Sequence, residues 1–136
     1  MTQKIVDDLS YEILGCAIEV HRELGPGLLE SVYKHCLLYE LTSKNFSWQS
    51  EVRVPLIYNN TNLDVDLRLD VLVEDLVVVE IKAIDGILPV HMAQLLTYMK
   101  LTERPKGLLV NFNCVNIFKE GQKTLVNEFY ANLPKK

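Results

Sequence analysis

Two carboxylates and one ammonium group lie close together in the sequence, on segments with the alternation of β-strands. Asp70 is followed ten residues later by Glu80, and Lys82 comes two residues after that. Because alternate residues of a strand point to the same face, Glu80 and Lys82 share a face. Carboxylate and carbonyl oxygens are the ligands that Mg²⁺ prefers. Asp70, Glu80 and the carbonyl oxygen of Ile81 are therefore candidate ligands for Mg²⁺ or Mn²⁺.

Such a trio has a definite chemical use. A bound divalent metal lowers the pKa of its water and neutralises charge that builds up on a phosphate. Lys82 can orient the attacking water or stabilise the transition state, a role that suits a compact ammonium group. The alternative is a cross-strand salt bridge among the three side chains, whose only role is to keep one end of the sheet soluble. The spacing alone favours this alternative, because an acid followed by acid-x-Lys arises often by accident.

The hydrophobic pattern predicts how these residues are positioned. Odd positions from 63 to 73 are apolar and most even positions are charged, which predicts a strand with one buried face. Residues 76–83 are apolar on both faces until Glu80, as in a central strand. For Asp70 to face the same side as Glu80, the hairpin loop needs an odd number of residues. We therefore predict a loop of residues 73–75 or a bulge, with Asp70 diagonal to Glu80.

Two further segments carry polar residues at helical spacing. His91, Gln94 and Tyr98 form one stripe of a helix, from which Gln94 and Tyr98 can reach a metal ligand or a substrate phosphate. The alternative is that this stripe is an ordinary surface face of the helix, with the ring of Tyr98 anchored in the core. His91 by itself is typical of a residue in the first turn of a helix. Glu30 lies in the first turn of an earlier helix, where the helix dipole alone explains a carboxylate.

The composition is that of one ordinary soluble domain over residues 1–136, with 49% hydrophobic and 24% charged residues. No apolar run approaches the ~20 residues that span a bilayer, and no leader peptide is evident. Three scattered cysteines argue against a disulfide framework, so we expect a cytoplasmic protein without membrane contact. The net charge of −4 counts against a strong nonspecific grip on nucleic acid. It leaves two alternatives, scattered solvated cations or a local basic rim of Arg22, Lys34, Arg68, Lys100, Arg104 and Lys106.

Periodicity predicts two helices, a three-stranded meander, a third helix and further β structure, hence an α+β mixed sheet flanked by helices. A strand after the third helix should lie parallel to the Glu80 strand. We expect the second helix to bury Leu29, Val32, Cys36, Leu37 and Leu41. The predicted helices cover residues 4–24, 28–44, 90–102 and 123–130, and the predicted strands cover residues 46–58, 63–73, 76–83, 107–112 and 115–119.

Larger motifs surround these residues. The segment Gly27-Leu28-Leu29-Glu30-Ser31-Val32-Tyr33 resembles the signature of the GxxExxY protein family, which is similar to the PD-(D/E)XK nuclease superfamily. The resemblance extends from about Ile13 through Phe112. It includes Arg68-Leu69-Asp70, Val79-Glu80-Ile81-Lys82-Ala83, Pro89-Val90-His91, Ala93-Gln94-Leu95-Leu96-Thr97-Tyr98 and Asn111-Phe112. Leu69 replaces the proline in the superfamily's name, which many members also lack.

The resemblance implies a restriction-endonuclease-like core in which Asp70, Glu80 and Lys82 occupy the metal and catalytic positions. Gln94 and Tyr98 look like the Q-x-x-x-Y motif of the exonuclease branches, and Glu30 resembles a first-helix acid that approaches the metal. The first hypothesis is a nuclease that uses Mg²⁺ or Mn²⁺ to hydrolyse DNA, with RNA as a second polymer. The other is a catalytically silent binding or assembly module with a protein partner. A homodimer or a partner would supply substrate grip to so small a domain.

Overall fold

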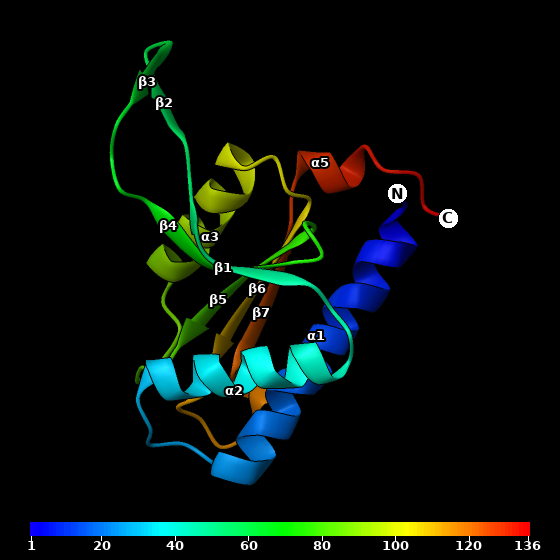
Figure 1. The fold of residues 1–136 in the computed structure, drawn as a ribbon, viewed down its shortest axis with the longest axis vertical. Helices are drawn as coiled ribbons and strands as arrows, with labels where there is room; N and C mark the ends of the chain where they lie inside the picture. Colours follow the sequence, from blue (N-terminus) through cyan, green and yellow to red (C-terminus); the bar gives the residue numbers. More distant parts are fainter.

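The computed structural model describes residues 1–136 and contains one mixed five-stranded sheet between helices (Figure 1). Its strand order is β1-β4-β5-β6-β7, with β5 and β6 parallel and the other neighbours antiparallel. The predicted mixed sheet flanked by helices is thus confirmed, as is the parallel strand after the third helix. The bounds are α1 Gln3–Leu24, α2 Glu30–Ser43, β1 Trp48–Arg53, β4 Arg68–Val73, β5 Val77–Lys82, α3 Pro89–Leu101, β6 Lys106–Asn111 and β7 Gln122–Val126.

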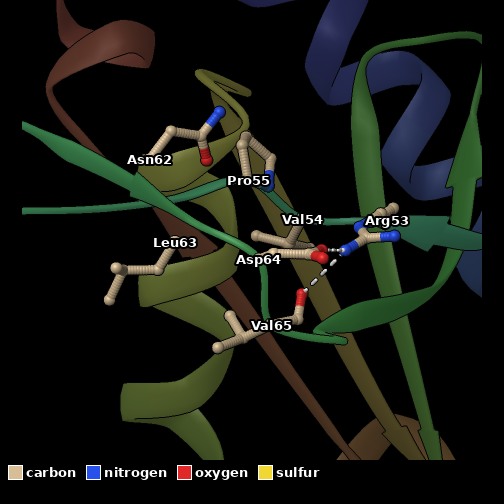
Figure 2. A pocket seen from close by; sticks show the side chains of 7 residues that line it. All are labelled: Arg53, Val54, Pro55, Asn62, Leu63, Asp64 and Val65. Carbon is tan, nitrogen blue, oxygen red and sulfur yellow. Dashed lines mark hydrogen bonds and ion pairs between the residues drawn. The ribbon is translucent and has the colours of Figure 1, made fainter.

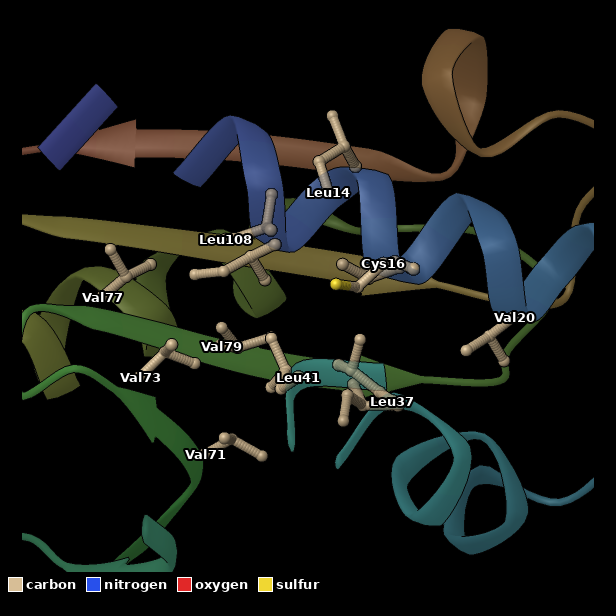
Figure 3. Close-up of a cluster of buried hydrophobic side chains, with 14 of the residues drawn as sticks. Leu14, Cys16, Val20, Leu37, Leu41, Val71, Val73, Val77, Val79 and Leu108 are labelled. Atoms are coloured by element: carbon tan, nitrogen blue, oxygen red, sulfur yellow. The ribbon is translucent and has the colours of Figure 1, made fainter. Parts of the chain in front are cut away.

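Helices α1 and α2 cover one face of the sheet and form the larger hydrophobic cluster (Figure 3). Leu37 and Leu41 of α2 are fully buried against Val71 and Val79 of the central strands. Burying each such side chain stabilises the fold by roughly 2 kcal/mol. The last turn of α1 ends at Gly25, whose φ of 66° lies in the left-handed region and whose amide donates to the carbonyl of His21.

The exposed side of α2 differs from the prediction. Leu29 and Val32 are 73% and 38% exposed and Cys36 is half-buried, whereas Tyr33, Leu37 and Leu41 face the sheet. The prediction that this helix buries all five residues is therefore wrong for Leu29 and Val32. The helix packs on the sheet through a narrower face, and it leaves apolar side chains in water.

Helix α3 covers the opposite face with a smaller cluster. Leu95, Tyr98 and Met99 pack against Leu72 and Val78 of β4 and β5. Residues on both faces of β4 are therefore buried, and the prediction of a single buried face for this strand is wrong. Leu69 and Leu72 of β4 lie on this side while Val71 and Val73 lie on the other, so the alternation of β4 is broken next to Asp70, whereas in β5 Val78 alternates regularly with Val77 and Val79.

The hairpin between β4 and β5 has the odd loop length that was predicted, with a register shifted by one residue. Val73 pairs with Val77, so the loop comprises residues 74–76 instead of 73–75. Glu74 and Asp75 adopt left-handed backbone angles, with φ of 52° and 57°. Continued one step past its last pair, Val71 and Val79, this register sets Asp70 opposite Glu80 instead of diagonal to it, and a hydrogen bond joins the two carboxyl groups.

The two long strands expected around residues 54–67 are interrupted. β1 ends before Val54 and Pro55, and a separate hairpin of β2 (Leu56–Tyr58) and β3 (Thr61–Leu63) projects from the body (Figure 1). Pro55 has no amide to donate to a strand ladder, which explains the break. A two-residue turn with φ of 55° and 59° at residues 59 and 60 closes this arm.

The chain after β6 also departs from the prediction. Residues 117–120 form the short helix α4 (Ile117–Glu120) where a strand was expected, because the side chain of Asn116 caps the helix by accepting from the amide of Lys119 at 2.9 Å. The predicted helix over 123–130 is wrong in its first half. There β7 pairs with β6, and only α5 (Glu128–Ala131) is helical. No helix in the structure is both long and apolar enough to cross a membrane.

Candidate active site

Asp70 lies where β4 separates from β5 and where its pairing with β1 is interrupted for one residue. The ladder to β5 ends at the pair Val71 and Val79. The ladder to β1 skips only Glu51, which lies opposite Asp70 with a left-handed φ of 55°, and resumes at Val52 and Leu69. Oδ2 of Asp70 accepts a hydrogen bond from the amide of Ile81 at 2.8 Å. The carboxylate thus takes the place of a main-chain acceptor, and this bond fixes the side chain against β5.

Glu80 is a buried carboxyl group on the same side of the sheet. It is 5% exposed, and its Oε1 has no hydrogen-bond partner. Burial raises the pKa of Glu80 to about 9, together with its hydrogen bond to Asp70 and the charge of Asp70, while the charge of Lys82 opposes the shift. Glu80 therefore holds a proton at neutral pH, and its protonated carboxyl group lies next to Asp70.

Lys82 lies at the end of β5, half-buried and on the same side as Glu80. None of the eight ion pairs in the molecule involves this lysine. Its positive charge favours the ionised forms of Glu80 and Glu30. The ammonium group is thus available to a negatively charged ligand, instead of being fixed in the cross-strand salt bridge considered as the alternative.

Two predicted residues of α3 join this group. Nε2 of Gln94 donates to the hydroxyl of Tyr98 at 3.2 Å, and Tyr98 is 8% exposed. Burial raises the pKa of Tyr98, and the charges of Glu80 and Asp70 add to this, so the phenol faces the acidic pair. His91 has a local role, because its Nδ1 accepts from the amide of Leu88 at 2.9 Å at the start of the helix.

Glu30 approaches the same centre from the start of α2. Partial burial raises its pKa, and the charge of Asp70 adds to this effect, while Lys82 and Lys34 oppose it. Glu30 is exposed to solvent, unlike Glu80. The acidic group thus receives side chains from β4, β5, α2 and α3, which are the four elements that the sequence assigned to it.

Tyr33 holds the loop that positions Glu30. It is fully buried and stacks on Phe112 with ring centroids 4.5 Å apart. Its hydroxyl donates to the carbonyl of Gly25 at 2.5 Å and accepts from the amide of Leu28 at 3.1 Å. The tyrosine of the Gly27–Tyr33 motif therefore acts on the backbone that enters α2, and it does not touch the acidic pair.

Asn111 is a polar residue at the site that the sequence analysis did not single out for a role. It is 3% exposed and pairs in register with Lys82. Its side chain accepts from the amide of Ile84 and donates to the carbonyl of the same residue, both at 3.0 Å, and so fastens the segment that leaves β5. The signal in the sequence is a lone Asn in the apolar run of residues 107–112.

The donor set fits a hard divalent cation. Two carboxyl groups converge, and the buried Oε1 of Glu80 lacks the partner that buried polar atoms normally have. Oxygen donors of this kind suit Mg²⁺ or Mn²⁺. The structure contains no cluster of three or more His, Cys, Asp or Glu residues arranged around one point, so further ligands must be carbonyl oxygens or water.

Of the cations considered as a basic rim, Lys34 and Arg68 both contact Glu51, which lies opposite Asp70, and several of the six are held in ion pairs. Arg104 pairs with Asp75 at 2.7 Å, and Lys106 pairs with Asp7 at 2.6 Å. Lys34 is close enough to lower the pKa of Glu30, and it is paired with Glu51 at 2.5 Å. All four arginines of the chain form ion pairs with carboxylates. Most of these cations are therefore already neutralised by carboxylates, and among the lysines near the acidic pair Lys82 has no ion pair.

The acidic group is open to the surface and lies in none of the five cavities. One cavity of about 410 Å³ lies instead at the root of the β2–β3 arm (Figure 2). There Arg53 donates to the carboxylate of Asp64 and to the carbonyl of Val65. No predicted site residue lines this cavity, whose ion pair and hydrogen bond fix the direction of the arm.

Comparison with known proteins agrees with this geometry. A family model described as the PD-(D/E)XK nuclease superfamily matches residues 7–125. A search of curated proteins and a search of solved structures gave no match. The mixed five-stranded sheet flanked by helices is consistent with the restriction-endonuclease-like fold of that superfamily. Because the matched range covers most of its length, this chain belongs to the PD-(D/E)XK nuclease superfamily.

Proposed function

We propose that this protein is a nuclease of the GxxExxY family that hydrolyses phosphodiester bonds of DNA with Mg²⁺ or Mn²⁺. The observation that carries the proposal is the buried carboxyl group of Glu80, whose Oε1 has no partner and which faces Asp70. A buried, unpartnered carboxyl group weakens a fold unless a ligand completes it. Proteins of this superfamily generally depend on a divalent metal, so the ligand that we expect at Glu80 is a divalent metal ion.

Each residue has one task in this proposal. Asp70, Glu80 and the carbonyl oxygen of Ile81 hold the ion, which supplies when bound an acidified water and a counter-charge for the phosphate. Lys82 orients the attacking water or stabilises the charge that develops on the phosphate. The amide of Ile81 fixes the carboxylate of Asp70 at 2.8 Å, so that ligand is already oriented in the free protein.

The remaining site residues contact the substrate or support the ligands. Gln94 is exposed and bonded to Tyr98, so its amide is available to a phosphate or to the water around the ion. The hydroxyl of Tyr98 faces the two carboxyl groups. Glu30 accepts a proton or a hydrogen bond from water at the outer side of the pair, where partial burial and the charge of Asp70 raise its pKa.

The experiment pairs metal binding with cleavage. We expect Mg²⁺ or Mn²⁺ at millimolar concentration or below to shift the amide resonances of Asp70, Glu80 and their neighbours, and Asp70→Asn to abolish the response. Asp75→Asn changes a carboxylate at the far end of the same hairpin and should leave it intact. Removing the ammonium group with Lys82→Ala should lower the cleavage rate about 10²–10³-fold, as for other groups that stabilise transition-state charge.

Single-stranded, duplex and branched DNA and the matching RNAs serve as substrates for wild type and Lys82→Ala. Cleavage of RNA alone would refute the choice of polymer. A flat metal titration, with both proteins equally inert on every nucleic acid, would refute the nuclease and support a silent assembly module. Metal binding without cleavage of any substrate would support the metal site and refute the proposed hydrolysis.

A further inference from the structure

Helices α1 and α2 enclose a groove on the side of the molecule away from the sheet. Its volume is about 450 Å³, within the usual range of ligand pockets. Its apolar lining comes from Val20 and Leu24 on α1 and from Cys36 and Tyr39 on α2. Val20 belongs to the larger hydrophobic cluster, so the groove reaches down to the core. Figure 1 shows the two helices crossing in front of the sheet.

The apolar surface continues beyond the groove along α2. Tyr39 and Leu24 are 71% and 38% exposed, and Val32 and Leu29 extend the same surface toward the start of the helix. Residues spaced three and four apart lie on one side of a helix, so Val32, Cys36 and Tyr39 form one stripe. The stripe spans about two turns, roughly 11 Å, and continues past the groove, so it matches an apolar face of another helix.

The rim of the groove is acidic. Glu19 and Glu23 border it from α1 and Glu40 from α2, His35 also lines it, and no lysine or arginine does so. Glu19 has a counter-charge in Arg22, which pairs with it at 3.0 Å through a side chain that is 71% exposed. Three carboxylates around an apolar floor repel nucleic acid and anionic lipid, and they attract cations.

We propose that this groove binds a lysine- or arginine-rich amphipathic segment of a partner protein. The apolar face of the segment covers the stripe of α2, and its cations meet the three glutamates on the rim. A second copy of this chain matches poorly, because each copy carries a net charge of −4 and eight of its 14 lysines and arginines are already in ion pairs. This inference does not depend on the proposed nuclease activity.

The probe is a synthetic helical peptide of about 18 residues, long enough to form a helix, with leucine at helical spacing and lysine elsewhere. We expect it to bind with amide shifts confined to α1 after residue 17 and to α2. A peptide with glutamate in place of lysine should not bind. A scrambled lysine–leucine peptide, which lacks an apolar face, should bind at least tenfold more weakly.

Variants test the two parts of the groove separately. The double variant Glu23→Lys with Glu40→Lys should weaken binding at least tenfold at low salt, and Tyr39→Ser should weaken it at any salt concentration. Glu103→Lys with Glu128→Lys makes the same charge change at exposed sites outside the groove and should retain binding. Equal binding of the scrambled peptide, equal loss in the control variant, or shifts elsewhere on the surface would overturn the proposal. Concentration-dependent dimerisation through the same residues would identify the occupant as a second copy, and would also overturn it.

Discussion

Replacing Glu80 with glutamine should stabilise the metal-free protein, and by an amount that depends on pH. The folded chain keeps a proton on Glu80 up to about pH 9, whereas the unfolded chain loses it near the ordinary value of 4.5. Below pH 4.5 both states are protonated and the residue does not oppose folding. Between pH 4.5 and 9 each pH unit lowers the free energy of unfolding by about 1.4 kcal/mol. At pH 7 the carboxyl group of Glu80 therefore lowers it by about 3 kcal/mol.

The assay is urea unfolding of wild type and Glu80→Gln in a chelator, at several pH values from 5 to 8. The glutamine keeps the shape and removes the titration, so the difference between the two unfolding free energies isolates the carboxyl group. We expect that difference to increase by up to about 4 kcal/mol across this range. Glu103→Gln, which changes an exposed carboxylate far along the chain, serves as the control and should show no such trend.

A divalent metal should reverse the order of stability. Mg²⁺ or Mn²⁺ binds the folded protein only when Glu80 has lost its proton, so the gain in melting temperature of wild type should increase from pH 6 to pH 8. Glu80→Gln should gain little at either pH. A difference in unfolding free energy that stays constant between pH 5 and 8 would refute the assignment of the raised pKa to this buried site.

Three further substitutions test how the site is supported. Tyr33→Phe removes the hydroxyl that bonds the carbonyl of Gly25, and we expect a loss of about 1–3 kcal/mol by urea unfolding, with an unchanged fold by circular dichroism. Asn111→Ala removes the side-chain bonds that fasten the segment after β5, and hydrogen exchange should show faster opening of residues 83–88 than of α1. Gly107→Ala would place a methyl group 2.5 Å from the sulfur of Met99, so a loss of about 1–3 kcal/mol is expected, measured as a lower urea midpoint.

The parts of the fold that could be predicted from the sequence are those whose pattern is set by local burial. The 22 residues of α1 carry a repeating apolar stripe, and β5 is apolar on both faces because both helical layers cover it. The odd length of the hairpin loop followed from the requirement that Asp70 and Glu80 share a face. The exact register did not follow, because a shift by one residue in a three-residue loop preserves that parity.

The errors lie where tertiary contacts outweigh local pattern. Residues 122–126 have a mixed pattern that suits a helix, yet they pair with the free edge of β6 and become a strand. Residues 29 and 32 are apolar and helical, and the prediction placed them in the core. Their exposure depends on how α1 crosses α2, which no local pattern encodes.

The acidic site itself depends on a break in the sheet that the residue types do not reveal. The ladder between β4 and β5 ends at Val71, just before Asp70, and the ladder between β4 and β1 skips the position of Asp70, where Glu51 adopts a left-handed backbone. A continuous ladder would give the amide of Ile81 a main-chain acceptor, and the carboxylate would have no reason to turn toward β5. The opening of β4 is therefore what brings Asp70 to the buried carboxyl group of Glu80, and restoring the regular strand should separate them even with every site residue retained.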